Sequence, residues 1–90
     1  MIKFNEKMLN AAHKHSIFHI EEIMKSEICG CFYCLNNYKP DKILEWVDED
    51  DSRGKTALCP KCNIDAVLGS ESGYPVADKY FLQAMYKYYF

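Results

Sequence analysis

Apolar positions in the N-terminal third of the chain recur at helical spacing. The two series are Phe4, Met8, Leu9 and Ala12, and then Ile17, Ile20, Ile23 and Met24. Such intervals place apolar side chains on one face of an α-helix. Ser16 precedes the second series and is a suitable N-cap. We therefore predict helices over residues 5–14 and 17–27. One continuous helix is the alternative, because no Gly or Pro separates them.

After residue 28 the helical periodicity ends, and short apolar stretches alternate with turn residues. Residues 43–47 are predicted to form a short strand or a helical turn, with Trp46 buried in either case. Residues 48–55 are polar and contain a glycine, which is typical of a loop. Residues 56–58 have the composition of a strand, so we expect a short β-hairpin here.

The C-terminal third contains two further helical patterns. The first is short. Its apolar members are Ile64, Val67 and Leu68, and Gly69 can end it. Residues 70–75 are expected to form a loop, because they contain Ser, Gly and Pro. In the terminal segment 76–90, the second pattern predicts a helix over residues 78–89.

Aromatic residues are concentrated in this last helix. They are Tyr80, Phe81, Tyr86, Tyr88, Tyr89 and Phe90. These positions fall on more than one helix face, so one core cannot cover them all. Aromatic surfaces are common in protein interfaces, and they can also stack nucleic-acid bases. Only Lys79 and Lys87 accompany them, which disfavours nucleic-acid binding. We therefore expect part of the helix to pack in the core and part to form a face for a protein partner or a homodimer. The pattern does not distinguish a monomer from a dimer.

The composition limits the classes of function. The chain has 90 residues, 49% of them hydrophobic and 14% aromatic, so we expect one domain over residues 1–90. A chain of this length often needs a disulfide, a metal or a partner to stabilise its thin core. The formal charge of −2 argues against general nucleic-acid binding, although it leaves room for a local basic patch.

The cysteines indicate a reducing compartment. Five of the 90 residues are cysteine, an odd number. Residues 1–6 lack the apolar core of a secretion signal, and no apolar run approaches the roughly 20 residues that span a bilayer. We therefore expect a cytoplasmic protein that does not enter a membrane, in which paired cysteines serve a metal or a reaction.

Four of the cysteines form two C-x-x-C pairs, Cys31 with Cys34 and Cys59 with Cys62. Two intervening residues let the backbone fold into a knuckle that directs both sulfurs at one ion. Four thiolates around one centre match the tetrahedral coordination of structural zinc. The pairs therefore predict that one Zn²⁺ per chain is bound by Cys31, Cys34, Cys59 and Cys62.

The same residues allow alternatives to zinc. The four thiols could be packed without a metal, one pair could be a redox dithiol, or iron could occupy the tetrahedron. Cys29 is the remaining cysteine, and its C-x-C spacing to Cys31 suits shared chelation less well than a knuckle. We expect Cys29 to be a packed thiol, since free cysteine is often buried. It would replace Cys31 only if the knuckle shifted register.

Two other polar clusters are candidates for chemistry. His13, His15 and His19 lie close together with Glu22 nearby, and the last two histidines would share a face of a continuous helix. They could bind a second metal or serve acid–base chemistry, but no H-E-x-x-H pattern is present, so surface or hydrogen-bonded histidines are the simpler interpretation. The acidic run 48–51 could hold Ca²⁺ or Mg²⁺, but it lacks EF-hand spacing and is expected to be a solvated loop.

The knuckle sequences resemble the zinc-binding half of treble-clef HNH nucleases. The matching residues are the C-x-Y-C string at 31–34 and the string at 56–63, which ends in C-x-x-C-N. This resemblance, over less than half of the chain, implies a hairpin between the knuckles and a helix after the second one. The catalytic Asp-His pair of the nucleases has no counterpart, because all three histidines precede the first knuckle.

A longer set of residues is similar to a family of small bacterial cytoplasmic proteins with a C-G-C-F-Y-C … C-P-x-C zinc motif. The set consists of residues 26–34, Trp46-x-Asp48, residues 59–65 and residues 72–75. Asn63 stands where a glycine is expected after the second knuckle, and Asn tolerates the left-handed φ of such a turn. The resemblance implies zinc and a cytoplasmic location, but no activity.

Together these patterns predict a small α+β fold. It would have N-terminal helices in segment 1–28, a treble-clef-like four-cysteine zinc centre with a short β-hairpin in 29–69, and an aromatic helix in 76–90. The leading interpretation is a structural-zinc protein-interaction module that is not an enzyme. The alternatives are a nucleic-acid-associated protein derived from an HNH-like clef and a hydrolase that uses the three histidines.

Overall fold

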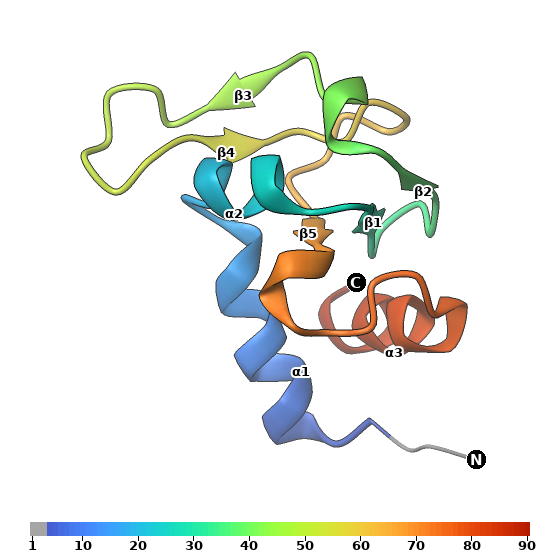
Figure 1. Cartoon of the computed structure of the whole chain (residues 1–90). Coiled ribbons are helices and arrows are strands. Elements are labelled where there is room, and N and C mark those ends of the chain that lie inside the picture. The colour runs from blue at the N-terminus through green and yellow to red at the C-terminus, as the bar shows by residue number, and fades with distance from the viewer. Residues whose placement is uncertain (1–3) are drawn as a thin grey trace.

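Two helices, a run of short strands and a final helix follow one another along residues 4–90, the part of the chain that the computed structural model describes (Figure 1). The helices are α1 (Glu6–His13), α2 (Ile20–Lys25) and α3 (Lys79–Tyr89), and the strands are β1 (Cys29–Cys31), β2 (Asn37–Tyr38), β3 (Trp46–Val47), β4 (Thr56–Ala57) and β5 (Val67–Gly69). Short 3-10 turns lie at Lys14–Ser16, Pro40–Lys42 and Ser70–Ser72. None of the helices in residues 4–90 is long and apolar enough to cross a membrane.

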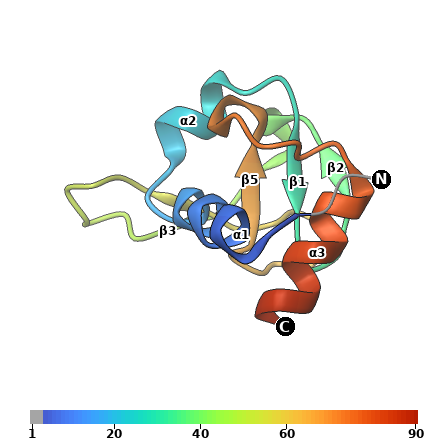
Figure 2. The same ribbon diagram turned by 90° about the horizontal axis from the view of Figure 1, so that it is seen from below.

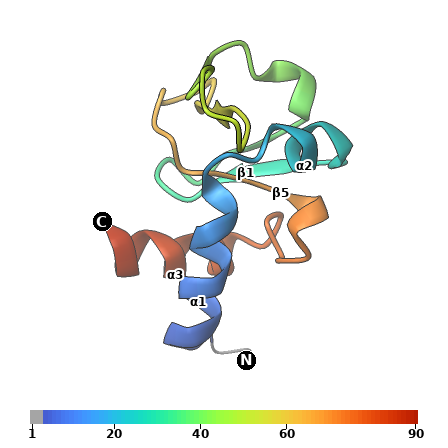
Figure 3. The same cartoon turned by 90° about the vertical axis from the view of Figure 1, so that its left-hand side faces the viewer.

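A three-stranded antiparallel sheet forms the middle layer, in the order β2-β1-β5. Its central strand β1 is buried along its whole length, and Cys29 pairs with both Tyr38 and Gly69. The β3–β4 hairpin lies on one side of this sheet, and α1 and α3 lie on the other (Figures 1 and 3). Seen from below, α1 lies in front of β5, with α3 beside it near β1 (Figure 2). This arrangement confirms a small α+β fold.

Two separate helices form at the N-terminus, in place of one continuous helix. The chain turns between them at Phe18, whose φ is 52°. Helix α2 is shorter than the predicted 17–27, because it begins only after this turn. The prediction that Ser16 caps α2 is wrong. The Ser16 hydroxyl instead donates a 2.6 Å hydrogen bond to the carbonyl of His13 and closes the turn after α1.

The helix predicted over residues 64–68 is not formed, because the last two of these residues belong to β5. Strand β5 is buried throughout, and a short buried strand cannot be told from a buried helical turn by apolar spacing alone. Gly69 does not end a helix. It lies in the strand, where a Cβ would collide with the Ser26 hydroxyl. The helix that the treble-clef resemblance implies after the second knuckle is therefore replaced here by a strand.

Most other predicted elements are confirmed. Strands β3 and β4 pair as a hairpin around the polar loop at 48–55, and α3 matches the helix predicted over 78–89. Asp78 caps α3 by accepting a 2.8 Å hydrogen bond from the Tyr80 amide. Trp46 is half-buried and not buried as predicted, because a two-stranded hairpin is covered on one face only.

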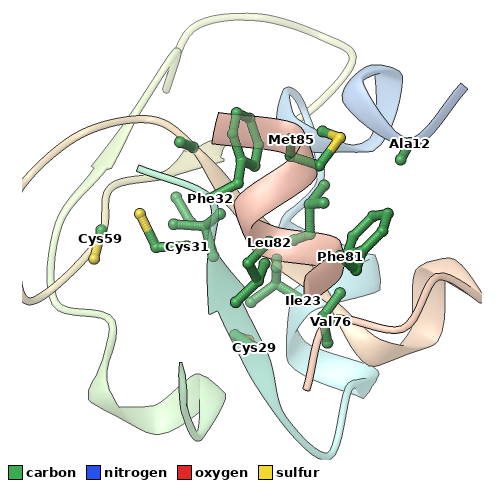
Figure 4. Close-up of a cluster of buried hydrophobic side chains, with 14 of the residues drawn as sticks. Ala12, Ile23, Cys29, Cys31, Phe32, Cys59, Val76, Phe81, Leu82 and Met85 are labelled. Carbon is green, nitrogen blue, oxygen red and sulfur yellow. The ribbon is translucent and has the colours of Figure 1, made fainter. Parts of the chain in front are cut away.

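Gly30 in β1 lies close against α3 and the chain that leads into it. A Cβ at this position would lie 2.5 Å from the Val76 carbonyl oxygen and 3.2 Å from Cδ2 of Leu82. The buried face of α3, which includes Phe81 and Met85, packs into the hydrophobic core (Figure 4). The missing side chain of Gly30 thus allows the helix to lie against the sheet.

Replacing Gly30 with Ala should lower the free energy of unfolding by about 1–3 kcal/mol, because the chain before α3 must move away from the sheet. Denaturant unfolding measures this loss. Gly73→Asn is the matched control, since Gly73 has φ 86° and open space around it and Asn tolerates that conformation. Equal stability of the Gly30→Ala variant and the wild type would contradict the close approach.

Candidate metal centre

The two C-x-x-C segments fold into knuckles with the same backbone geometry. In the first, the amide of Leu35 donates to the carbonyl of Cys31 at 2.8 Å. In the second, the amide of Asn63 donates to the carbonyl of Cys59 at the same distance. Leu35 and Asn63 both have left-handed φ, at 63° and 64°. The residue after each pair thus closes the turn, and Asn63 takes the left-handed conformation expected at its position.

Hydrogen bonds from within each knuckle point at the sulfurs. The Tyr33 amide lies 3.4 Å from Sγ of Cys31, and the Lys61 amide lies 3.3 Å from Sγ of Cys59. Donors of this kind stabilise thiolates, because they face the charge that develops on sulfur. Both knuckles are therefore arranged to hold ionised cysteines.

The knuckles bring four sulfurs together from distant parts of the sequence. The Sγ atoms of Cys31, Cys34, Cys59 and Cys62 all lie within 4.8 Å of one another. The shortest contacts cross between the knuckles, at 3.6 Å for Cys31–Cys62 and 3.6 Å for Cys34–Cys59. A tetrahedral zinc site with Zn–S bonds of about 2.3 Å needs sulfur–sulfur separations of about 3.8 Å. The geometry of these four residues fits such an ion.

This cluster joins two layers of the molecule. The first knuckle connects β1 to β2 in the sheet, and the second follows β4 of the hairpin and leads to β5. Cys31 and Cys59 are buried at the edge of the hydrophobic core (Figure 4), whereas Cys34 and Cys62 are partly exposed. A metal ion here would link the hairpin to the sheet and would be closed off from the core side.

The environment affects the thiols of Cys31, Cys59 and Cys62 differently. Burial raises the pKa of Cys31, and it raises the pKa of Cys62 to about 11. Burial acts in the same direction on Cys59, but polar contact with Tyr38 and amide donors from its own knuckle outweigh it and lower the pKa of Cys59 to about 7. Neighbouring thiolates repel one another, so a cation is what allows all four to ionise together.

Cys29 lies apart from this cluster. It is fully buried in β1, outside the group of four sulfurs. Burial raises the pKa of its thiol to about 12. These properties are those of a packed thiol and agree with the expected role of Cys29.

The three histidines have separate environments. His13 stacks on Tyr89 with ring centroids 4.1 Å apart, and Nδ1 of His15 lies 2.9 Å from Glu22. His19 is buried, with Nδ1 2.6 Å from the His15 carbonyl. Within residues 4–90, three or more possible metal ligands converge at the four-cysteine cluster. The histidines do not form a second cluster of this kind.

The ring of His19 connects the N-terminal segment to the hairpin. Nδ1–H donates to the His15 carbonyl, and Nε2 accepts a 3.0 Å hydrogen bond from the buried amide of Ala57 in β4. Only the neutral ring can make both bonds. Burial lowers the pKa of His19, and the acceptor role of Nε2 is consistent with that direction. His19 is therefore a structural residue in this fold.

The acidic run is arranged as an exposed loop. Asp48 accepts a 2.8 Å hydrogen bond from the Thr56 hydroxyl, and Asp51 forms an ion pair with Arg53 at 2.8 Å. The Arg53 guanidinium also lies 3.8 Å from the centre of the Phe18 ring. These contacts use the carboxylates to order the hairpin loop against the turn before α2.

Two side chains beside the cysteines were missed by the sequence interpretation. Nδ2 of Asn36 lies 3.3 Å from Sγ of Cys34, and the Tyr38 hydroxyl is buried beside Cys59. Both residues follow the first knuckle within four positions. A polar side chain at these positions was the available signal. For Tyr38 this signal was weak, because the neighbouring cysteine lies on the other knuckle.

Comparison of the chain with family models, curated proteins and solved structures found no match. The assignment of the site therefore depends on its own geometry.

His19 should stay neutral to a lower pH than a free histidine, whose pKa is about 6.5. Between its lowered pKa and 6.5, the unfolded chain binds more protons than the folded one, so stability decreases as the pH falls through this window. An NMR titration of the His19 ring should give a midpoint below 6.5. In the His19→Gln variant, the loss of stability on acidification should be smaller. A His19 midpoint at or above 6.5 would contradict the neutral, buried ring.

Proposed function

We propose that this chain is a zinc-binding protein in which Cys31, Cys34, Cys59 and Cys62 hold one Zn²⁺ in a structural site. The observation that carries the proposal is the convergence of the four sulfurs within 4.8 Å from two equivalent knuckles. Four thiolates in a tetrahedron favour zinc, and iron is the main competitor for this donor set. Four protein ligands leave no open position for a substrate, so the role of the ion is structural.

The surface beside the first knuckle supports a role in protein interaction. Tyr33 of the knuckle contacts Phe90 edge-on at 4.8 Å and Tyr86 at 5.8 Å, and the last two rings stack at 5.7 Å. Tyr33 is 41% exposed, Phe90 is 57% exposed and Tyr86 is 40% exposed. Exposed aromatic clusters are enriched in interfaces, so we assign this surface to a protein partner or a second copy, within the cytoplasm.

We propose that the centre is a treble-clef variant. The first knuckle and the hairpin that follows it support this proposal, and a second knuckle that leads to β5 takes the place of the usual helix. The alternatives have less support. A hydrolase that uses His13, His15 and His19 lacks a convergent site, since each ring is engaged by a different partner. A nucleic-acid-associated protein would need basic surface, and the chain has a net charge of −2.

Native mass spectrometry of the purified protein tests the metal and the assembly together. The wild type and the Cys29→Ser variant should each carry one zinc per chain, whereas Cys62→Ser should lose it, because a fourth thiolate is missing. Cys29→Ser is the matched control for removing a sulfur. Metal-free wild type would contradict the proposal, and so would zinc retained in Cys62→Ser but lost in Cys29→Ser. The mass also distinguishes monomer from dimer.

A further inference from the structure

One face of α3 carries a stripe of side chains that points away from the core. Its members, spaced four, three and four residues apart, are Lys79, Gln83, Tyr86 and Phe90. At 3.6 residues per turn, these positions lie along one line of the helix. Gln83 is half-buried, and the other three are exposed. Helix α3 lies on the side of the sheet away from the hairpin (Figures 1 and 3), so this stripe forms an outer surface of the molecule.

The polar groups of the stripe have no partners within the described residues. Neither a hydrogen bond nor an ion pair is formed there by the Lys79 ammonium, the Gln83 side-chain amide or the Tyr86 hydroxyl. In contrast, the Tyr88 hydroxyl, on the side of the helix that faces α1, donates to Glu6 at 2.6 Å. The stripe thus presents a cation, an amide and a phenol that are free to contact another molecule.

The stripe is complementary to itself when a second copy lies antiparallel to it. A two-fold axis that passes midway between residues 84 and 85 places Lys79 opposite Phe90 of the second copy, because the two are equally far from the axis. The same axis places Gln83 opposite Tyr86 of the second copy. The spacing of four, three and four is also that of the contact positions in a coiled coil. Each layer of such a pair would contain two different side chains.

We propose that this face of α3 is the interface of a two-fold dimer, in which Lys79 of one copy lies against the Phe90 and Tyr33 rings of the other. The inference rests on the interaction role proposed for this surface and specifies its partner. The Phe90 and Tyr33 rings meet edge-on at 4.8 Å, with an angle of 76° between them. An ammonium group is attracted to aromatic rings in this position.

The second layer and the distribution of charge agree with this pairing. The Gln83 amide meets a Tyr86 hydroxyl, with which it forms a hydrogen bond between the copies. The two Lys79 side chains lie at opposite ends of the helix pair, about 16 Å apart along its axis. This separation exceeds the screening length of about 8 Å at physiological salt. A parallel pairing would instead place lysine against lysine, although residues 79–90 contain no acidic side chain to compensate.

Sedimentation equilibrium of the zinc-loaded protein over a range of concentrations tests the proposal. One helix from each copy makes a small interface, so the wild type should form a weak, reversible dimer. Tyr86→Ser and Lys79→Glu should each weaken it by about ten-fold or more. Tyr88→Ser is the matched control and should leave the dimer unchanged, because Tyr88 has almost the same exposure as Tyr86, at 42% against 40%, but faces α1.

A charge exchange tests the register. The double variant Lys79→Glu/Phe90→Lys should dimerise more tightly than Lys79→Glu, because the introduced charges meet only across the dimer and lie about 16 Å apart within one copy. Lys79 is exposed in the first turn of α3, where an acidic side chain is favourable, so the variants should fold, and circular dichroism verifies this.

Three results would overturn the inference. They are a wild type that stays monomeric at every concentration, equal weakening by Tyr86→Ser and Tyr88→Ser, and a double variant that dimerises no better than Lys79→Glu. Zinc content is measured in the same samples, so a zinc-loaded monomer would contradict the dimer and leave the proposed metal site standing. Such a monomer would leave the surface to a different protein.

Discussion

The convergence of four sulfurs is the constraint on which the rest of the fold depends. Cys31 ends β1 and Cys34 lies in the turn that leads to β2, whereas Cys59 and Cys62 follow the hairpin. An ion bound between them would fasten two layers that are far apart in the sequence. The strands themselves are two or three residues long, and strands this short have little stability alone. A structural zinc contributes about 10 kcal/mol or more in small peptides, against about 5–15 kcal/mol for the total stability of a domain.

Other contacts position these layers without needing a metal. Gly30 lets α3 lie against β1, and the neutral ring of His19 connects the turn before α2 to the backbone of β4. A metal bound by the four cysteines would act on the same hairpin as these contacts, since His19 holds Ala57 and the second knuckle begins two residues later at Cys59. The proposed aromatic surface depends on the same arrangement, because Tyr33 lies inside the first knuckle and contacts the last turn of α3.

The sequence predicted the parts of the molecule that local rules control. The spacing of the C-x-x-C pairs indicated the sulfurs that meet, and apolar periodicity located α1 and α3. It failed where tertiary contacts decide. Val67 and Leu68 form a strand because β1 is available as a partner, and their spacing alone could not show this. Tyr38 could not be placed beside Cys59 from the sequence, because the two residues become neighbours only after folding. The histidines similarly took roles set by different neighbours, and not by their closeness in sequence.

The most direct test of the account is the thermal unfolding of the protein before and after zinc removal, followed by calorimetry. The metal content of each sample is verified by mass, and the chelator is removed before the scan. We predict one cooperative transition for the zinc-loaded protein and the loss of that transition in the zinc-free protein, with recovery when one equivalent of zinc is restored. An unchanged transition after verified removal of the metal would contradict the claim that the four-cysteine centre holds the fold together.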